Sequence, residues 1–242
     1  MGLLNWIKKV ILVIICIILL ISLLAMNALF VVSSSLSHDN VKQSLKPVIA
    51  NEIYKNMSNI DSNFNEMKIY CQSHTEFNIT NGYDFSIPCN EILNGTSESI
   101  VDSQIDKFID DFYYKQYNCN FWQCFNGNPF FIVSETSYKY LKNNFYISIV
   151  ISIILALIIF FLVDFKRNLL IILGILLVLS SLPFAKFDIF SNLVNEEILS
   201  FLTVLFKQAN LIFLIIFILG IVLIASGIGL KIWNSKSQIK KK

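Results

Sequence analysis

Charged residues are scarce in this chain of 242 residues. Aspartate, glutamate, lysine and arginine together make up only 15% of it, whereas 55% is hydrophobic and the mean hydropathy is +0.63. Soluble domains of this length rarely contain so few charges, and membrane proteins commonly do. The scarcity of charge therefore predicts an integral membrane protein.

Histidine is rarer still, and the motifs of common enzymes are absent. The two histidines, His38 and His74, have no cysteine or glutamate partner at metal-ligand spacing, so we expect both at the surface and predict no metal site. The chain contains no G-x-S-x-G, no H-E-x-x-H and no P-loop. We therefore expect a non-enzymatic protein that has no cofactor and does not bind nucleic acid.

Long apolar runs are plentiful, by contrast. A helix needs about 20 apolar residues to cross a bilayer. Residues 10–32, 146–163 and 211–232 form such runs, and 169–185 forms a shorter one that we also expect to span. The first run is longer than the apolar region of a cleaved signal peptide, so we expect a signal anchor. The sequence predicts four transmembrane helices.

The distribution of basic residues predicts the orientation of these helices. Residues 1–9, 164–168 and 233–242, together with Lys231, hold nine basic residues and one acidic residue. Residues 33–145 hold eight lysines and thirteen carboxylates. Because lysine and arginine collect on the cytoplasmic side, we predict a plasma-membrane protein with both termini in the cytoplasm. Residues 33–145 and 186–210 would then lie outside the cytoplasm.

The predicted spans contain no charged residue in their interiors, which argues against an ion path. The strongest polar group within them is Asn27, which we expect to bond a neighbouring helix. Small residues at four-residue steps predict close helix packing or a contact between copies of the chain, and they are Ser148, Ser152, Ala156, Ala225 and Gly229.

Four of the five cysteines lie in the predicted external segment, where disulfides persist, and the fifth, Cys16, lies in the first span. Four cysteines allow three pairings. We prefer Cys71–Cys89 and Cys119–Cys124 because each closes a local loop. Three glycosylation sequons, at Asn56, Asn78 and Asn94, also lie in this segment.

The external segment is expected to form a mostly helical domain between the first two spans. Apolar spacing predicts helices at 41–60 and 97–117, the second beginning at a Ser97 or Ser99 cap, with a disulfide-closed loop or hairpin at 65–94 between them. Residues 134–145 should continue as helix into the second span. The fold class is therefore an all-α membrane protein with four transmembrane helices and a disulfide-stapled extracytoplasmic domain.

Two smaller features of the external segments carry expectations. Asp102, Asp106 and Asp110 repeat every four residues, and we expect a solvated helix face rather than a cation site there because no calcium loop accompanies them. Polar residues recur at steps of three and four in 186–210, which predicts an amphipathic helix that does not cross the membrane. It lies in the outer membrane surface or serves as a platform beneath the external domain, and the two interpretations are compatible.

Three aromatic residues beside the second pair of cysteines, Phe121, Trp122 and Phe125, have two interpretations. Large aromatic side chains are usually at least partly buried, so we favour a core cluster over an exposed binding tip.

The pattern as a whole predicts a function in binding rather than catalysis. We expect the external domain to bind a membrane or cell-surface protein, or to support an envelope assembly. The alternative is an accessory subunit or small channel-like component of a transporter.

Overall fold

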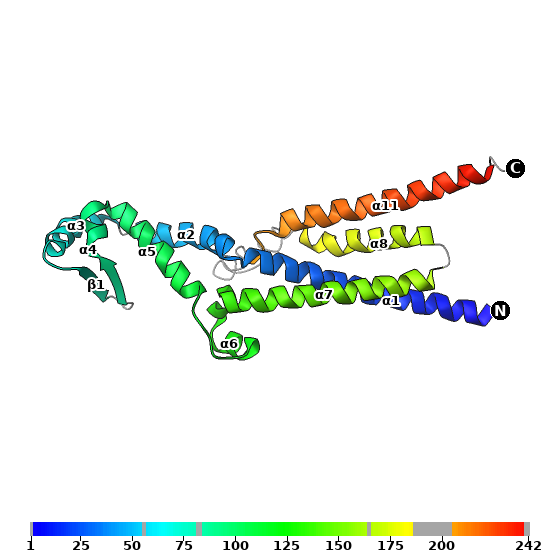
Figure 1. Cartoon of the computed structure of the whole chain (residues 1–242), viewed down its shortest axis with the longest axis horizontal. Helices are drawn as coiled ribbons and strands as arrows, with labels where there is room; N and C mark the ends of the chain where they lie inside the picture. The colour runs from blue at the N-terminus through cyan, green and yellow to red at the C-terminus, as the bar shows by residue number, and fades with distance from the viewer. Residues whose placement is uncertain (1, 55–56, 81–83, 164–165, 186–204, 240–242) are drawn as a thin grey trace. The chain divides into compact units, whose positions relative to one another are not determined.

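The computed structural model describes residues 2–54, 57–80, 84–163, 166–185 and 205–239 (Figure 1). It is mostly helical and divides into two compact units. The helix bundle comprises residues 1–36 and 137–242, and the inserted unit comprises residues 37–136. The inserted unit interrupts the chain between the first and second helices of the bundle.

The described helices of the bundle include three long ones. They are α1 (Gly2–Ser35), α7 (Glu135–Leu162) and α11 (Ala209–Ile239), while α8 (Lys166–Ser181) is shorter and is extended by the 3₁₀ turn η2 (Leu182–Phe184). Helix α7 runs unbroken from the polar residues at Glu135 into its apolar part, as the sequence predicts for 134–145.

Three helices of the bundle are long and apolar enough to cross a membrane. The apolar stretches are Trp6–Ser35, Glu135–Leu162 and Ala209–Trp233, and Asn168–Phe184 is a shorter apolar helix. A membrane protein is therefore supported, while the fourth span remains a prediction. The predicted amphipathic helix at 186–210 lies mostly outside the described residues, because the description resumes at Leu205.

Helices α8 and α11 lie side by side, and glycines bring their backbones into contact (Figure 1). A Cβ atom added to Gly174 of α8 would lie 2.7 Å from the carbonyl oxygen of Gly220 of α11. Farther along α11, a Cβ on Gly227 would lie 2.7 Å from Cγ1 of Ile171. Only residues without a side chain allow such an approach, which adds dispersion contacts between helices in lipid.

The small residues predicted to pack α11 lie on another side of that helix. Ala225 is exposed, and a Cβ on Gly229 would meet no described atom within 4 Å. These two residues therefore do not take part in the contact with α8, which uses Gly220 and Gly227, and a contact between copies of the chain stays a prediction for them. On α7, Ser148 and Ala156 are half-buried, whereas Ser152 is buried and shares a 3.0 Å hydrogen bond with Ser22 of α1.

A buried amide links α1 to α8. The Asn27 side chain is fully buried, and its Nδ2 donates to the carbonyl oxygen of Ser180 at 3.1 Å and to Ser180 Oγ at 3.0 Å. This is the interhelical bond expected for Asn27. A polar group in an apolar bundle is costly to leave unpaired, so the bond specifies how the two helices align.

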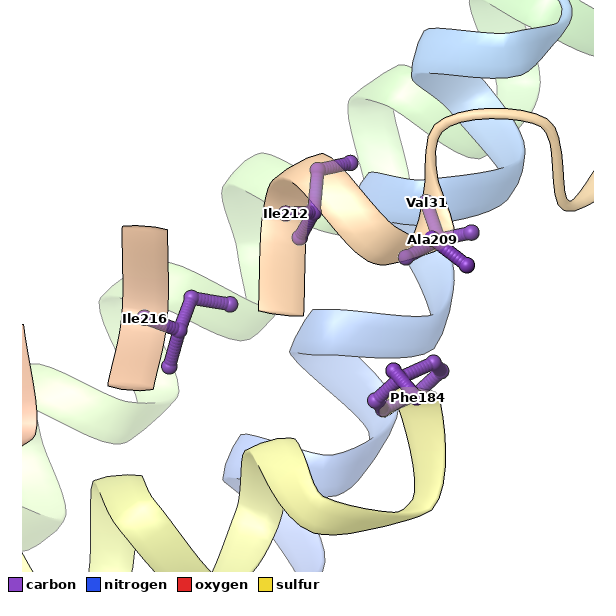
Figure 2. Close-up of a cluster of buried hydrophobic side chains, with 5 residues drawn as sticks. All are labelled: Val31, Phe184, Ala209, Ile212 and Ile216. Carbon is purple, nitrogen blue, oxygen red and sulfur yellow. The ribbon is translucent and has the colours of Figure 1, made fainter. Parts of the chain in front are cut away.

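An apolar cluster joins the ends of three bundle elements. Figure 2 shows Val31 of α1, Phe184 of η2, and Ala209, Ile212 and Ile216 of α11, all buried. Ser35 is the last residue of α1, and its Oγ accepts a 3.3 Å hydrogen bond from the backbone N–H of Gln208. The start of α11 is thereby tied to the end of α1.

The inserted unit contains five described helices, a 3₁₀ turn and a hairpin. In chain order they are α2 (His38–Tyr54), α3 (Met57–Cys71), β1 (Glu76–Thr80), β2 (Asp84–Pro88), α4 (Cys89–Asn94), α5 (Ser97–Tyr113), α6 (Phe121–Gly127) and η1 (Pro129–Val133). The single helix expected at 41–60 is thus described as parts of two helices, and Pro47 lies inside α2.

The hairpin and its neighbours form the apolar core at one end of the inserted unit. Strands β1 and β2 pair antiparallel, with Phe77 opposite Ile87. The disulfide Cys71–Cys89 joins the end of α3 to the start of α4, and both cysteines are buried with Ile87, Ile92 and Ile100. The prediction of a disulfide-closed hairpin in this region is confirmed.

The N-cap of helix α5 lies one residue before Ser97, the earlier of the two caps that the sequence suggests. The N-cap is Thr96, whose Oγ1 accepts from the backbone N–H of Ser99 at 3.2 Å. The Ser99 hydroxyl in turn accepts from the backbone N–H of Thr96 at 2.9 Å, which completes a reciprocal capping box. Ser99 is therefore the N3 partner rather than the cap itself.

Candidate binding site

Helix α6 is a short element held by the second disulfide. Cys119, just before the helix, is bonded to Cys124 within it, the pairing preferred from the sequence. The backbone N–H of Cys124 donates to the carbonyl oxygen of Asn120 at 3.0 Å, and Cys124 itself is buried. The disulfide therefore fixes two turns of helix that would be too short to persist alone.

A buried phenylalanine packs against helix α6 and supports it. Phe131 of η1 is 0% exposed, and the ring of Tyr117 meets it edge-on at 4.9 Å between centroids. Phe121, the first residue of α6, lies against the same Phe131 ring at 5.7 Å and stacks on Phe125 at 6.2 Å. Phe131 and Phe121 thus join α6 to the 3₁₀ turn that follows it.

The remaining aromatic side chains project into solvent. Trp122 is 65% exposed, Phe130 is 62% exposed and Phe125 is also exposed. The favoured interpretation of a buried cluster is therefore wrong for Trp122 and Phe125, and only Phe121 is half-buried. The reason is geometric: successive helical residues point about 100° apart, so a two-turn helix that buries Cys124 must expose the other side.

We call Phe121, Trp122, Phe125 and Phe130 the aromatic tip. The sequence did not single out Phe130, although it follows Pro129 in the same short region. The signal that identifies the whole region is the absence of charge, because no Asp, Glu, Lys or Arg lies between Lys115 and Glu135.

Tyr117 packs against Phe131, the residue that supports the aromatic tip. Its hydroxyl is buried and has no hydrogen-bond partner among the described residues. Burial raises the pKa of the Tyr117 phenol above its ordinary value, because the phenolate would lose its hydration. The residue therefore stays neutral and acts as a supporting ring rather than an acid or base.

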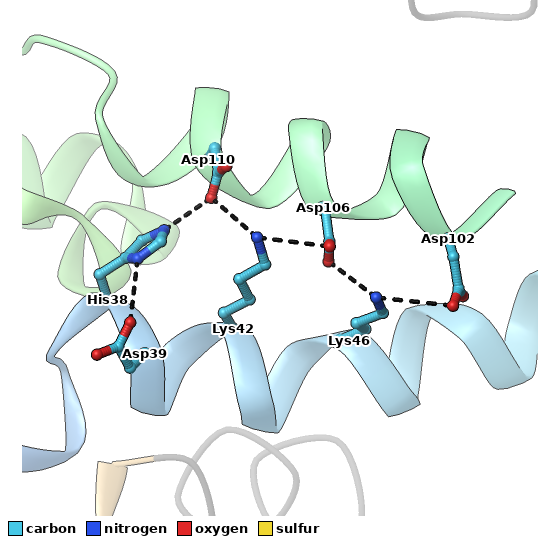
Figure 3. A network of polar contacts seen from close by, with 7 residues as sticks. All are labelled: His38, Asp39, Lys42, Lys46, Asp102, Asp106 and Asp110. Atoms are coloured by element: carbon cyan, nitrogen blue, oxygen red, sulfur yellow. Dashed lines mark hydrogen bonds and ion pairs between the residues drawn. The ribbon is translucent and has the colours of Figure 1, made fainter. Parts of the chain in front are cut away.

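The aspartate row of α5 is a ladder of ion pairs with α2 rather than a solvated face (Figure 3). Lys46 Nζ lies 3.1 Å from Asp106 and 3.7 Å from Asp102, and Lys42 Nζ lies 3.5 Å from Asp106 and 3.7 Å from Asp110. The expectation of a solvated row is wrong because α2 runs antiparallel to α5 with its basic residues in the same four-residue step.

His38 ends this ladder. Its Nε2 lies 2.7 Å from Asp110 Oδ1, and its ring meets the ring of Tyr113 edge-on at 5.2 Å. His38 is therefore a link between α2 and α5, not a free surface residue. A hydrogen bond to Asp106 raises the pKa of the Lys46 ammonium above its ordinary value. Together these contacts hold two helices in register.

The described residues contain no group of three or more His, Cys, Asp and Glu side chains arranged to hold a metal ion. His74 lies apart from the ladder, stacked on Tyr70 with 3.8 Å between ring centroids. The ladder carboxylates are engaged by lysine and histidine, so their arrangement is that of a structural contact.

The three sequons differ in what the structure describes of them. Asn78 is exposed on β1 and faces Ser86 of β2. Asn94 is exposed at the end of α4, where its Nδ2 donates to the carbonyl oxygen of Asn90 at 3.0 Å. Asn56 lies outside the described residues. Asn78 and Asn94 are therefore both accessible, and glycosylation stays a prediction.

Comparison with known proteins adds no relative. The chain matches no family model, and neither a curated protein nor a solved structure is significantly similar to it.

Proposed function

We propose that this chain is a non-enzymatic, multi-pass plasma-membrane protein whose inserted unit lies outside the cytoplasm and binds a partner through the aromatic tip. Both termini are cytoplasmic. The partner is a membrane or cell-surface component, and binding serves recognition or the support of an envelope assembly.

The anchoring part of the proposal rests on the bundle. Three of its helices have the length and apolarity of membrane spans, and the basic residues collect at one set of their ends. The charge balance of 33–145, with thirteen carboxylates against eight lysines, has the character of an external segment. Two disulfides in the inserted unit fit an oxidising compartment.

A fourth span is part of the proposal because α8 packs closely against α11 and therefore belongs to the bundle. The glycine contact at Gly174 and Gly220 brings backbone against backbone, as small residues do within membranes. With η2, the apolar stretch Asn168–Phe184 is clearly shorter than the other three and a few residues short of the about 20 that cross a bilayer, and a modest local thinning of the bilayer accommodates it. Four spans also keep all basic ends on one side.

The observation that carries the binding function is the exposure of Trp122. A large aromatic side chain that is left in water on a disulfide-fixed helix gains free energy when a partner covers it. Tryptophan is also among the residues that contribute most to binding energy in interfaces. Because the disulfide and Phe131 already order the helix, little conformational entropy is lost when the partner binds.

Affinity purification from intact membranes tests this function. We expect a partner to co-purify with the full chain in mild detergent and to be lost from the Trp122→Ala variant. Trp233→Ala is the matched control, because Trp233 is also exposed but lies on α11 of the bundle. A partner retained by Trp122→Ala would refute the binding tip, and a stoichiometric transporter would favour the accessory-subunit alternative.

A further inference from the structure

The exposed side of α6 combines aromatic rings with side-chain amides. Trp122 and Asn126 are four residues apart and Trp122 and Phe125 are three apart, so the three side chains are neighbours on the helix surface. Gln123 is exposed one residue after the tryptophan, and Asn118 and Asn120 are exposed just before the helix. The helical spacing therefore places the Asn126 amide beside the Trp122 ring.

These amides are available to a ligand. The Asn120 side chain makes no capping hydrogen bond although it precedes the helix, and Asn118, Asn120, Gln123 and Asn126 are all exposed. Asn128, by contrast, has a structural role, since its side-chain oxygen accepts from the backbone N–H of Phe130 at 3.0 Å. An amide offers both a donor and an acceptor, which matches a pair of adjacent hydroxyl groups.

We infer that this surface binds a neutral oligosaccharide, which makes the partner in the proposed function a glycan; the inference rests on that function. One face of a pyranose ring presents C–H groups that stack on an aromatic ring, while its rim presents hydroxyls. Trp122 and Phe125 supply the apolar face, and Asn126 and Gln123 supply groups for the hydroxyls. No charged residue lies between Lys115 and Glu135. Sulfated or carboxylated sugars would find no opposite charge there, so a neutral sugar fits this surface better.

A lipid surface fits these residues less well. Insertion of Trp122 and Phe125 into a bilayer would also bury Gln123 and Asn126, and burial of an amide without a partner in an apolar medium is unfavourable. Basic residues that attract lipid headgroups are likewise absent from this segment.

The test uses the full chain in phosphatidylcholine nanodiscs, which avoids detergents with sugar headgroups. The chain has three tryptophans, so a Trp6→Phe/Trp233→Phe variant leaves Trp122 as the sole indole reporter. The probes are the tetrasaccharides of cellulose, chitin, amylose and mannan, and a heparin tetrasaccharide serves as the charged comparison. We expect at least one neutral probe to shift the Trp122 emission to shorter wavelength in a saturable way.

Salt and sequence variants then identify the mode of binding. Affinity should change by less than about twofold between about 50 mM and about 500 mM NaCl, because no ion pair forms. By calorimetry, Trp122→Ala should weaken binding at least about tenfold and Phe125→Ala about threefold or more. Both side chains are exposed, so an unchanged thermal unfolding midpoint will show that each variant is folded.

Asn126→Leu separates a glycan from a lipid surface. Removal of the amide should weaken saccharide binding, whereas it should strengthen adsorption of added phosphatidylcholine vesicles if lipid is the natural occupant. The inference is overturned if no neutral probe binds, if binding survives Trp122→Ala, or if vesicles bind and Asn126→Leu strengthens them. If no probe binds but Trp122→Ala still loses a purified protein partner, the glycan inference fails and the proposed binding function stands.

Discussion

The two disulfides should contribute unequally to the stability of the inserted unit. Cys71 and Cys89 are 18 residues apart in sequence, and Cys119 and Cys124 are five apart. We therefore compare two double variants, Cys71→Ala/Cys89→Ala and Cys119→Ala/Cys124→Ala, each of which removes one disulfide without leaving a free thiol.

The expected difference follows from loop length and burial. In the loop-entropy description, closure of the longer loop is worth about 3 kcal/mol and closure of the shorter one about 2 kcal/mol. Alanine also removes two buried sulfur atoms from the cluster around Ile92 in the first variant, but one buried sulfur, that of Cys124, in the second. The first variant should therefore be less stable than the second by about 1–2 kcal/mol.

Pulse proteolysis of the full chain in nanodiscs measures this difference. The protein is equilibrated at increasing urea concentrations, exposed briefly to protease, and the fraction cleaved within residues 37–136 is quantified. The first variant should show the lower urea midpoint. If Cys119→Ala/Cys124→Ala has the lower midpoint, the reasoning from loop length and burial is wrong.

Three further predictions concern packing, ion pairs and pH. Gly220→Leu should separate α8 from α11 and lower the thermal midpoint of the bundle, whereas Gly229→Leu, which meets no described atom within 4 Å, should not. Asp106→Asn removes the carboxylate shared by two lysines and should cost about 1 kcal/mol in urea unfolding, with a smaller effect at high salt. Folding raises the pKa of both Tyr117 and Lys46, so their contribution to stability is present below about pH 10 and is lost as the pH rises through their folded pKa values. Circular dichroism should show alkaline unfolding in that range, and Tyr117→Phe should make it less steep.

Features set by a single element were predictable from the sequence. The apolar runs correspond to α1, α7 and α11, and the polar lead into α7 is helical because nothing between Glu135 and Tyr146 breaks a helix. The disulfide pairs follow from the local spacing of the cysteines. In each of these cases the relevant contacts lie close together along the chain.

Features that depend on which helix lies next to another were not predictable in the same way. The aspartates of α5 look like a solvated row until α2 supplies Lys42 and Lys46 at the same four-residue step. Once the two helices are antiparallel, both repeats match. The sequence contains both repeats, but it does not reveal that α2 is the neighbour of α5.

Two expectations rested on general tendencies that local geometry overrides. Trp122 is expected in a core because large aromatics are usually buried, but α6 buries only one side, which carries Cys124 and places Phe121 against Phe131. The four-residue step of Ala225 and Gly229 suggested packing, whereas the contact with α8 uses Gly220 and Gly227, seven residues apart. A seven-residue spacing also returns to the same side of a helix, and it would have pointed to the correct glycines.

The most direct test of the central claim is the side of the membrane on which the inserted unit lies. Lys107→Cys places a thiol at an exposed position of α5, and Lys242→Cys places one at the last residue of the sequence. A membrane-impermeant maleimide should label Lys107→Cys in intact cells and should label Lys242→Cys only after permeabilisation. Labelling of Lys242→Cys in intact cells, or protection of Lys107→Cys until permeabilisation, would contradict an extracytoplasmic binding domain on a bundle with cytoplasmic termini.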